Sequence, residues 1–374
     1  MRKNLVKNLS FALFDSGETI LGALIFSTFF PLYITQHIDT KIYSFVYGIS
    51  FIFSFIFALF LGKIADEKRL RKPFYILFIL LTGFLCISIG IFEQFPIIAL
   101  FLFSLMAISH QQAFVFYNSM LLDFEKKGFI SGLGVAFGYI GSAIALIFLA
   151  RVLHIPDVFY ITALIFLILS FPSMVFLENP QPSKKVSIKE VFKDRRFLLV
   201  ILSILSLTEV ANTLLAMMSI YLKKVYGFED VYIYKIIGFS AIGGILGGIV
   251  WGKLVDIFSA KKLFTFGFFL WIGFLIFLPL APAKIILTVG FLAGFSLAHL
   301  WTVSRVVILE EFPQEEASLR FSFLSLSERI ASTTGLLTWT ALLFFTGDNF
   351  RLSALLMVIF PVLGLALYWK VKSN

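Results

Sequence analysis

The chain has 374 residues, of which 59% are hydrophobic and only 14% are charged. This composition and a mean hydropathy of +0.96 exclude an ordinary soluble domain and indicate a chain that is embedded in lipid. The net charge of +9 lies in alternate loops between apolar stretches, a pattern that reports membrane topology and argues against a nucleic-acid partner.

Successive apolar stretches of about 20 residues each predict membrane-spanning helices. Because a strand or loop isolated in lipid would leave backbone groups unpaired, we predict an all-α membrane protein. The twelve predicted spans are 9–35, 42–61, 73–92, 97–122, 129–150, 157–177, 197–222, 232–251, 262–281, 284–308, 319–346 and 351–370. The polar segment 178–196 separates six spans from six, so we predict an N-terminal half over 1–177, a cytoplasmic linker over 178–196 and a C-terminal half over 197–374.

The loops on one side of the predicted bundle hold most of the basic residues. They are Arg2, Lys3 and Lys7, the bases within 63–72, Lys126 and Lys127, the bases within 184–196 and 253–262, and Lys370 and Lys372. The positive-inside rule therefore places both termini in the cytoplasm, with the chain in the cytoplasmic membrane. Asp15 and Glu18 interrupt the first apolar stretch, so we expect a retained first helix and no cleaved signal peptide. The single cysteine, Cys86, excludes an intramolecular disulfide.

Polar residues within the first six spans are candidates for a cavity. Asp15 and Glu18 are three residues apart and share one helix face, and an acid near the centre of a membrane costs about 2.5–3.5 kcal/mol. Such residues face partners or water, although Asp15 could instead extend toward the membrane surface. His110, Tyr117 and Asn118 follow in the fourth span, where the histidine has packing as its alternative role.

The later spans carry a second polar set. It comprises Glu209 and Asn212 in the seventh span, His299 and Arg305 in the tenth, and Glu328 and Arg329 in the eleventh. Glu328 and Arg329 are neighbours and cannot face each other on one helix, and which of the two faces the cavity stays open. Without partners these charges would cost on the order of 10 kcal/mol, so we expect Arg305 to pair with Glu328, Asp15 or Glu18 in a polar cavity.

Glycines with helical spacing mark the fifth and eighth spans. Residues 132, 134, 138 and 141 are glycines, as are residues 243, 244, 247 and 248. Small residues four apart let helix backbones approach closely. The spacing by itself therefore predicts close contacts of these two helices with neighbouring helices.

One short basic turn occurs twice at the same relative position. Gly252, Asp256 and Lys261 follow Gly62, Asp66 and Arg71 by 190 residues each, about half of the chain, which indicates an internal duplication. We predict that both turns act as cytoplasmic gates, made by Gly62, Asp66, Arg71 and Lys72 and by Gly252, Asp256, Lys261 and Lys262. Since carboxylates are favoured at helix N-termini, we expect each of the two aspartates to lie at the start of a neighbouring helix.

The same offset connects further polar residues. It maps Glu209 onto Thr19, one residue from Glu18, and His299 onto Ser109, one residue from His110. We therefore predict that the two glutamates and the two histidines share a proton-coupling site between the repeats, with coincidence as the alternative.

The duplicated turn resembles the signature between helices 2 and 3, and again between helices 8 and 9, of major facilitator transporters. Within that superfamily, Phe11–Asp15, Tyr117–Asp123, Ser131–Gly141, Glu209–Thr213 and Ser304–Arg305 resemble the family related to the fungal vacuolar amino-acid effluxers. Ser16–Thr19 and Leu207–Thr208 depart from that family's usual residues. The resemblance implies two six-helix halves, a cavity lined by helices 1, 4, 7 and 10, and alternating access. It also implies that Asp66 lies at the start of the eleventh span near Arg320, and Asp256 at the start of the fifth near Lys127. For the glycines of the fifth and eighth spans it implies a sliding contact between the two halves, with ordinary packing inside each half as the alternative.

These observations favour a secondary transporter that exports a small polar solute, an amino acid or a related metabolite, with proton coupling. We expect a monomer in the lipid bilayer with no metal and no cofactor. A lipid or lysolipid translocator and a non-transporting sensor are the alternatives. We do not expect an enzyme, because the sequence has neither a His-Glu-x-x-His stretch nor a Gly-rich phosphate loop.

Overall fold

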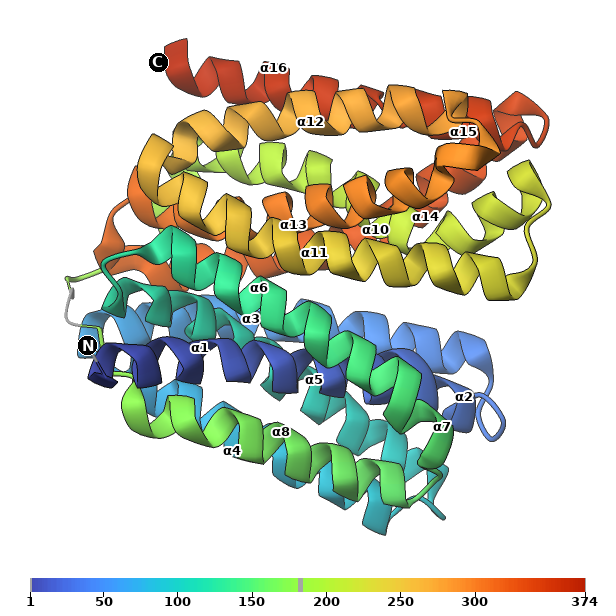
Figure 1. Cartoon of the computed structure of the whole chain (residues 1–374). Coiled ribbons are helices and arrows are strands. Elements are labelled where there is room, and N and C mark those ends of the chain that lie inside the picture. Colours follow the sequence, from blue (N-terminus) through green and yellow to red (C-terminus); the bar gives the residue numbers. More distant parts are fainter. Residues whose placement is uncertain (1, 181–183, 374) are drawn as a thin grey trace.

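The computed structural model describes residues 2–180 and 184–373, and in these ranges the chain is helical with no strand. Residues 181–183 of the predicted linker, and the two terminal residues 1 and 374, lie outside the described residues. The all-α prediction is confirmed, and Figure 1 shows long helices lying along one common axis.

Six membrane-crossing paths come first in the chain. They are built from α1 (Arg2–Leu21), η1 (Gly22–Phe29), α2 (Phe30–Ile34), α3 (Thr40–Lys68), α4 (Arg71–Ile91), α5 (Pro96–Ser119), η2 (Met120–Asp123), α6 (Lys127–Ile144), η3 (Ala145–Leu149), α7 (Ala150–Val152) and α8 (Asp157–Phe176). The first path widens into the π-helical η1 just before Pro31. A proline cannot donate a backbone hydrogen bond and its ring crowds the preceding turn, which accounts for the widening.

Six more paths follow the short helix α9 (Ile188–Lys193). They are α10 (Arg195–Tyr226), α11 (Asp230–Phe258), α12 (Ala260–Leu280), η4 (Ala283–Ile285) with α13 (Ile286–Glu311), η5 (Gln314–Glu316) with α14 (Ala317–Thr346), and α15 (Phe350–Leu356) with α16 (Ile359–Ser373). The last path breaks between α15 and α16, again shortly before a proline, Pro361.

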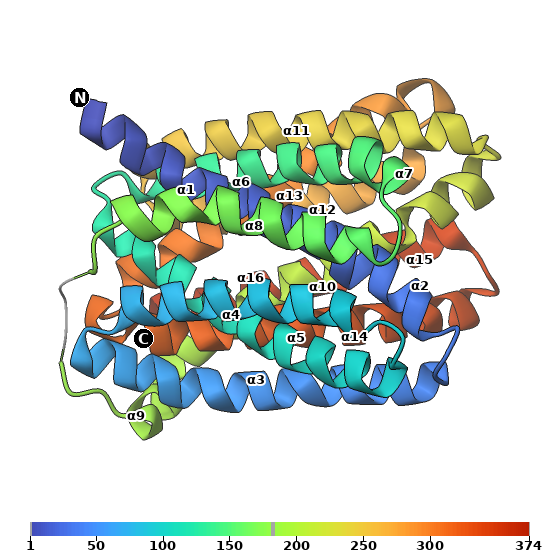
Figure 2. The same ribbon diagram turned by 90° about the horizontal axis from the view of Figure 1, so that it is seen from below.

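The two sets of helices lie side by side. In Figure 1, α1 to α8 form the lower group and α10 to α16 the upper group, with α6 and α11 where the groups meet. Figures 1 and 2 both show that α1 begins and α16 ends at the same end of the bundle, which we call the terminal end. The residue boundaries of the two halves remain predictions.

Eleven of the twelve predicted spans meet a simple test of length and apolarity within the described ranges, and α14 does not. It carries Arg320, Glu328 and Arg329 together with many hydroxyl residues, which dilute its hydrophobicity. Its 30 residues are nevertheless long enough to cross a bilayer, and it packs against α3, α5 and α10. The helix is therefore a polar crossing helix that is shielded by its neighbours.

Candidate functional site

The first basic turn joins α3 to the start of α14 at the terminal end. The carboxylate of Asp66 accepts hydrogen bonds from the backbone N–H groups of Ser318 (3.1 Å) and Leu319 (3.0 Å). A carboxylate in this position accepts hydrogen bonds from the free amide groups at the start of the helix. It is also stabilised by the positive end of the helix dipole. Arg320 lies one residue further on but pairs with Glu316 and Asp194 instead.

Arg71 completes this turn from inside the protein. Its Nε donates to Asp66 Oδ1 at 2.9 Å, and both side chains are fully buried. Its terminal nitrogens donate to the backbone carbonyls of Gln314 (3.2 Å) and Glu315 (3.1 Å), just before α14. One guanidinium therefore bridges the α3–α4 turn of one half and the α13–α14 turn of the other.

The second basic turn makes the equivalent contact with α6. Asp256 accepts from the backbone N–H groups of Gly128 and Phe129, each at 2.8 Å. Asp256 is exposed, and Lys261, the counterpart of Arg71, lies 3.6 Å from Glu311 instead.

The other predicted gate residues divide into two groups. Gly62 and Gly252 lie at the helix contacts themselves, since a Cβ at Gly62 would lie 3.0 Å from Leu319 Cα and one at Gly252 would lie 2.7 Å from the carbonyl oxygen of Gly128. Lys72 instead bonds the carbonyls of residues 175 and 177 within its own half, and Lys262 is exposed.

Glycines bring α6 and α11 into direct backbone contact. A Cβ at Gly132 would lie 1.9 Å from the carbonyl oxygen of Gly248, and a Cβ at Gly248 would lie 2.5 Å from that of Gly132. These positions lie between the two groups of helices. The glycines at 138 and 141 pack on α1, and those at 243 and 247 pack on α13, so both alternative roles occur at different positions.

A cavity of about 300 Å³ lies between the two groups of helices. Its lining comes from α1, α5, α6, α10, α13 and α14, and comprises Asp15, Glu18, Thr19, His110, Gln111, Phe114, Val135, Gly138, Tyr139, Ser142, Leu215, Trp301, Arg305, Glu328 and Arg329. Five of the predicted site residues therefore meet in one space, and Arg329 joins them: the five are Asp15, Glu18, His110, Arg305 and Glu328.

An ion pair crosses this cavity from one half to the other. Arg305 Nη1 on α13 lies 3.2 Å from Asp15 Oδ2 on α1, and both side chains are buried. The Tyr117 hydroxyl donates to the same carboxylate oxygen at 3.1 Å, and the guanidinium also lies over the rings of Phe114 and Tyr117. The expectation that Arg305 pairs with a carboxylate is confirmed, and the partner is Asp15.

A second polar pair lies on the N-terminal side of the cavity. His110 Nε2 on α5 lies 3.1 Å from Glu18 Oε1 on α1. A histidine ring nitrogen and a carboxylate oxygen at this distance can share one proton. Phe26 packs on the histidine ring, with 4.9 Å between ring centroids.

Glu328 and Arg329 both line the cavity, although they are adjacent on α14. Arg329 donates to Gln111 Oε1 at 3.1 and 2.9 Å and lies over the ring of Phe51. Within the described ranges the carboxylate of Glu328 has no hydrogen bond or ion pair. Gln111 was not among the predicted site residues; its signal is an amide in an apolar helix beside His110.

Several predicted cavity residues lie elsewhere. Glu209 is 6% exposed and accepts from the hydroxyl of Thr334, between α10 and α14. His299 is fully buried, and its Nε2 lies 2.9 Å from the carbonyl oxygen of Leu263 on α12. Asn212 and Asn118 do not line the cavity either; Asn212 donates to the backbone carbonyl of Glu328, and Asn118 is buried.

The sequence profile of the Major Facilitator Superfamily matches residues 19–250 and 236–374. The chain belongs to the major facilitator superfamily. It is 61% identical over 369 residues to an uncharacterized protein of Aquifex aeolicus (strain VF5), which covers 99% of this chain and 98% of that protein.

Solved structures of other facilitators share the fold. A bacterial homologue of the iron transporter ferroportin, in an outward-facing state, superimposes with a TM-score of 0.79 at 16% identity and covers 100% of both chains. The fucose:proton symporter of E. coli gives a TM-score of 0.77 at 14% identity and covers 99% of this chain and 98% of that one. The twelve-helix major facilitator architecture is therefore shown, and so is a multi-pass membrane protein of transporter fold.

Proposed function

We propose that this facilitator is a secondary transporter that moves a small polar solute by alternating access, coupled to protons. The observation that carries the proposal is the polar cavity at the junction of the two halves, where Asp15 and Arg305 join the halves and Glu18 and His110 form a second pair. Polar groups between two repeats are where transporters of this type bind solute and coupling ion.

The closed end supports alternating access. Asp66 and Asp256 hold α14 and α6 at the terminal end, which the positive-inside rule assigns to the cytoplasm. Opening toward the cytoplasm would separate α3 from α14 and α6 from α11, and would release both carboxylates. The glycines between α6 and α11 favour that separation, because Gly132, Gly248 and Gly252 place backbone against backbone there.

The charges in the cavity favour a zwitterionic solute. Glu328 has no partner within the described ranges, and Arg329 is held by the neutral amide of Gln111. A free carboxylate suits an ammonium group and a planar guanidinium suits a carboxylate. These two groups support an amino acid or a related metabolite, exported from the cytoplasm, as the resemblance to amino-acid effluxers implies.

Proton coupling is assigned to Glu18 and His110, because they lie in the cavity within 3.1 Å of each other. The test is solute transport in proteoliposomes with and without an imposed pH gradient. Glu18→Gln should retain exchange of solute and lose accumulation driven by the gradient. The matched control is Glu209→Gln, outside the cavity lining, and full coupling in Glu18→Gln with loss in Glu209→Gln would move the coupling site to α10.

A lysolipid is the second candidate substrate. An apolar cavity of about 100 Å³ lies among α10 to α13 and shares Leu215 with the polar cavity. An apolar chamber beside a polar one suits an amphiphile with a charged head group. Including lysophospholipids in the solute panel distinguishes the candidates: transport of lysolipid with none of amino acids would favour this reading.

A further inference from the structure

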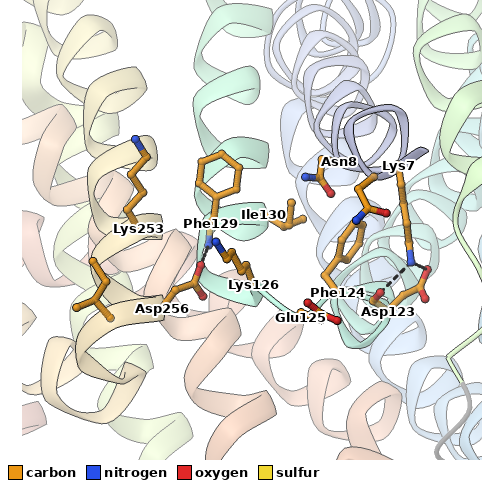
Figure 3. Close-up of a pocket in the computed structure, with 12 residues that line it drawn as sticks. Lys7, Asn8, Asp123, Phe124, Glu125, Lys126, Phe129, Ile130, Lys253 and Asp256 are labelled. Carbon is orange, nitrogen blue, oxygen red and sulfur yellow. Dashed lines mark hydrogen bonds and ion pairs between the residues drawn. The ribbon is translucent and has the colours of Figure 1, made fainter. Parts of the chain in front are cut away.

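A second polar cavity lies at the terminal end, outside the cavity between the two groups of helices. Its volume is about 750 Å³, and it is bounded by the start of α1, the η2–α6 connection and the end of α11. Figure 3 shows this pocket, which contains Asn4, Lys7, Asn8, Asp123, Phe124, Glu125, Lys126, Phe129, Ile130, Lys253, Asp256 and Ile257. The pocket is therefore built from both halves of the protein.

Three of the six charged residues in the pocket already have a hydrogen bond or an ion pair. Lys7 Nζ lies 2.8 Å from Asp123 Oδ2 and also donates to the carbonyl oxygen of that residue at 2.9 Å. Asp256 is occupied by the two amide groups at the start of α6. Figure 3 shows the pair of Lys7 and Asp123 on one side of the pocket and Asp256 on the other, with Lys126 and Glu125 between them.

Three charged residues of the pocket remain without a hydrogen bond or ion pair in the described ranges. They are Glu125, Lys126 and Lys253, and all three are exposed. The three lysines and three acids of the pocket balance overall, but the unengaged groups carry one net positive charge. Of their two lysines, Lys126 belongs to the N-terminal half and Lys253 to α11. Two free ammonium groups in one pocket suit a phosphate group.

The surroundings point to a phosphate that belongs to a lipid. Ile257 lines the pocket and is 69% exposed, and Leu5 on α1 is 59% exposed beside Asn4. Asn4, Lys7 and Asn8 have helical spacing on one face of α1, and they turn a polar face toward the pocket. A polar pocket bordered by exposed apolar side chains at a bundle end matches the boundary between head groups and acyl chains.

We propose that this pocket binds the head group of an anionic phospholipid of the leaflet at the terminal end, with Lys126 and Lys253 on the phosphate. The lipid holds α6 and α11 together, because the two lysines come from opposite halves. A ligand that binds only the closed arrangement shifts the equilibrium toward it. Anionic lipid therefore stabilises the conformation in which the terminal end is shut.

The first measurement is native mass spectrometry of the full chain in micelles that contain phosphatidylglycerol or phosphatidylcholine. The wild type should retain phosphatidylglycerol in preference, and Lys126→Gln/Lys253→Gln should weaken that retention at least about fivefold. The matched control is Lys189→Gln/Lys193→Gln, which removes two exposed lysines from α9 at the same end. Equal loss in both double variants, or equal retention of phosphatidylcholine by the wild type, would overturn the proposal.

The second measurement follows closure of the terminal end. Ser131 is buried on α6, and its hydroxyl donates to the carbonyl oxygen of Thr302 on α13 at 3.0 Å. In a Cys86→Ala background, Ser131→Cys should react with a thiol reagent several-fold more slowly in phosphatidylglycerol than in phosphatidylcholine, and Lys126→Gln/Lys253→Gln should abolish the difference. If inorganic phosphate slows the reaction as much as phosphatidylglycerol does, the site binds a soluble anion and the lipid proposal fails.

Discussion

The two basic turns make the same contact in different surroundings. Asp66 and Asp256 each accept two backbone N–H groups at a helix start, on α14 and α6 respectively. Asp66 is fully buried with Arg71 against it, whereas Asp256 is exposed and forms no ion pair with an arginine in the part of the chain that the structure describes. The duplication has kept the cap and changed what lies around it.

This difference assigns unequal roles to the two sides of the closed end. A buried carboxylate and guanidinium depend on each other, because either one alone would be an uncompensated buried charge. An exposed carboxylate can exchange helix amides for water at small cost. We therefore expect the α6–α11 side to open more readily than the α3–α14 side.

The largest test of this asymmetry removes each carboxylate in turn. Asp66→Asn leaves Arg71 buried without its partner and should cost about 3–5 kcal/mol of stability. Asp256→Asn loses only a charged cap and should cost about 1 kcal/mol. Thermal unfolding of the two purified variants measures the difference, and equal losses would show that the cap alone matters.

Exchanging the basic residues should produce the next largest effect. Arg71→Lys replaces a guanidinium that reaches Asp66 and the backbone carbonyls of Pro180, Gln314 and Glu315 with a single point charge, and should cost roughly 1.5–3 kcal/mol. Lys261→Arg changes a half-exposed partner of Glu311 and keeps its charge, so the change should stay within about 0.5 kcal/mol. The same unfolding assay reads both, and a larger loss in Lys261→Arg would reverse the assignment.

A side chain added at the glycine contact should weaken the α6–α11 side of the bundle and leave the α3–α14 side unchanged. Gly132→Ala places a Cβ 1.9 Å from the Gly248 carbonyl oxygen and should destabilise the closed bundle by about 1–3 kcal/mol. Gly238→Ala, also at a helical glycine but with no atom within 4 Å of the new Cβ, should be neutral or gain up to about 1 kcal/mol. Unfolding temperatures and transport rates in proteoliposomes separate the two variants. A neutral Gly132→Ala would mean that α6 and α11 can move apart without loss.

The smallest expected effect belongs to the ion pair of the second turn. Lys261→Gln removes a contact of 3.6 Å between a side chain that is 37% exposed and Glu311. Exposed pairs contribute little and are screened by salt, so the change in stability should be below about 0.5 kcal/mol. Unfolding at low and high salt provides the check, and a large loss that persists at high salt would contradict it.

The 190-residue repeat also pairs residues outside the two turns, when the offset of 190 is kept unchanged. It maps Glu209 onto Thr19, and each of these residues lies beside a glycine of another helix. A Cβ at Gly138 on α6 would lie 3.0 Å from Thr19 Oγ1, and one at Gly335 on α14 would lie 3.0 Å from Glu209 Oε2. It maps His299 onto Ser109, and these bond the backbones of α12 and α4 respectively.

We predicted Glu209 and His299 in the cavity because the repeat maps each of them to within one residue of a predicted cavity residue. One residue along a helix turns a side chain by about 100°, so Glu18 and Glu209 face different directions, as do His110 and His299. The pairing of Arg305 was predictable because a buried arginine requires a carboxylate. The amide of Gln111 was not, since many polar groups could have met Arg329.

The polar character of α14 bears on how the protein is assembled during synthesis. A helix with charges at Arg320, Glu328 and Arg329 partitions weakly into lipid by itself. Its polar groups are met by helices made earlier, because Asp66 and Ala58 on α3 bond its backbone amides and Ser322, and Gln111 on α5 receives Arg329. We therefore expect α14 to insert stably only after α3 and α5 of the N-terminal half are in the membrane. The helices made first would then provide the polar partners that the later helix needs.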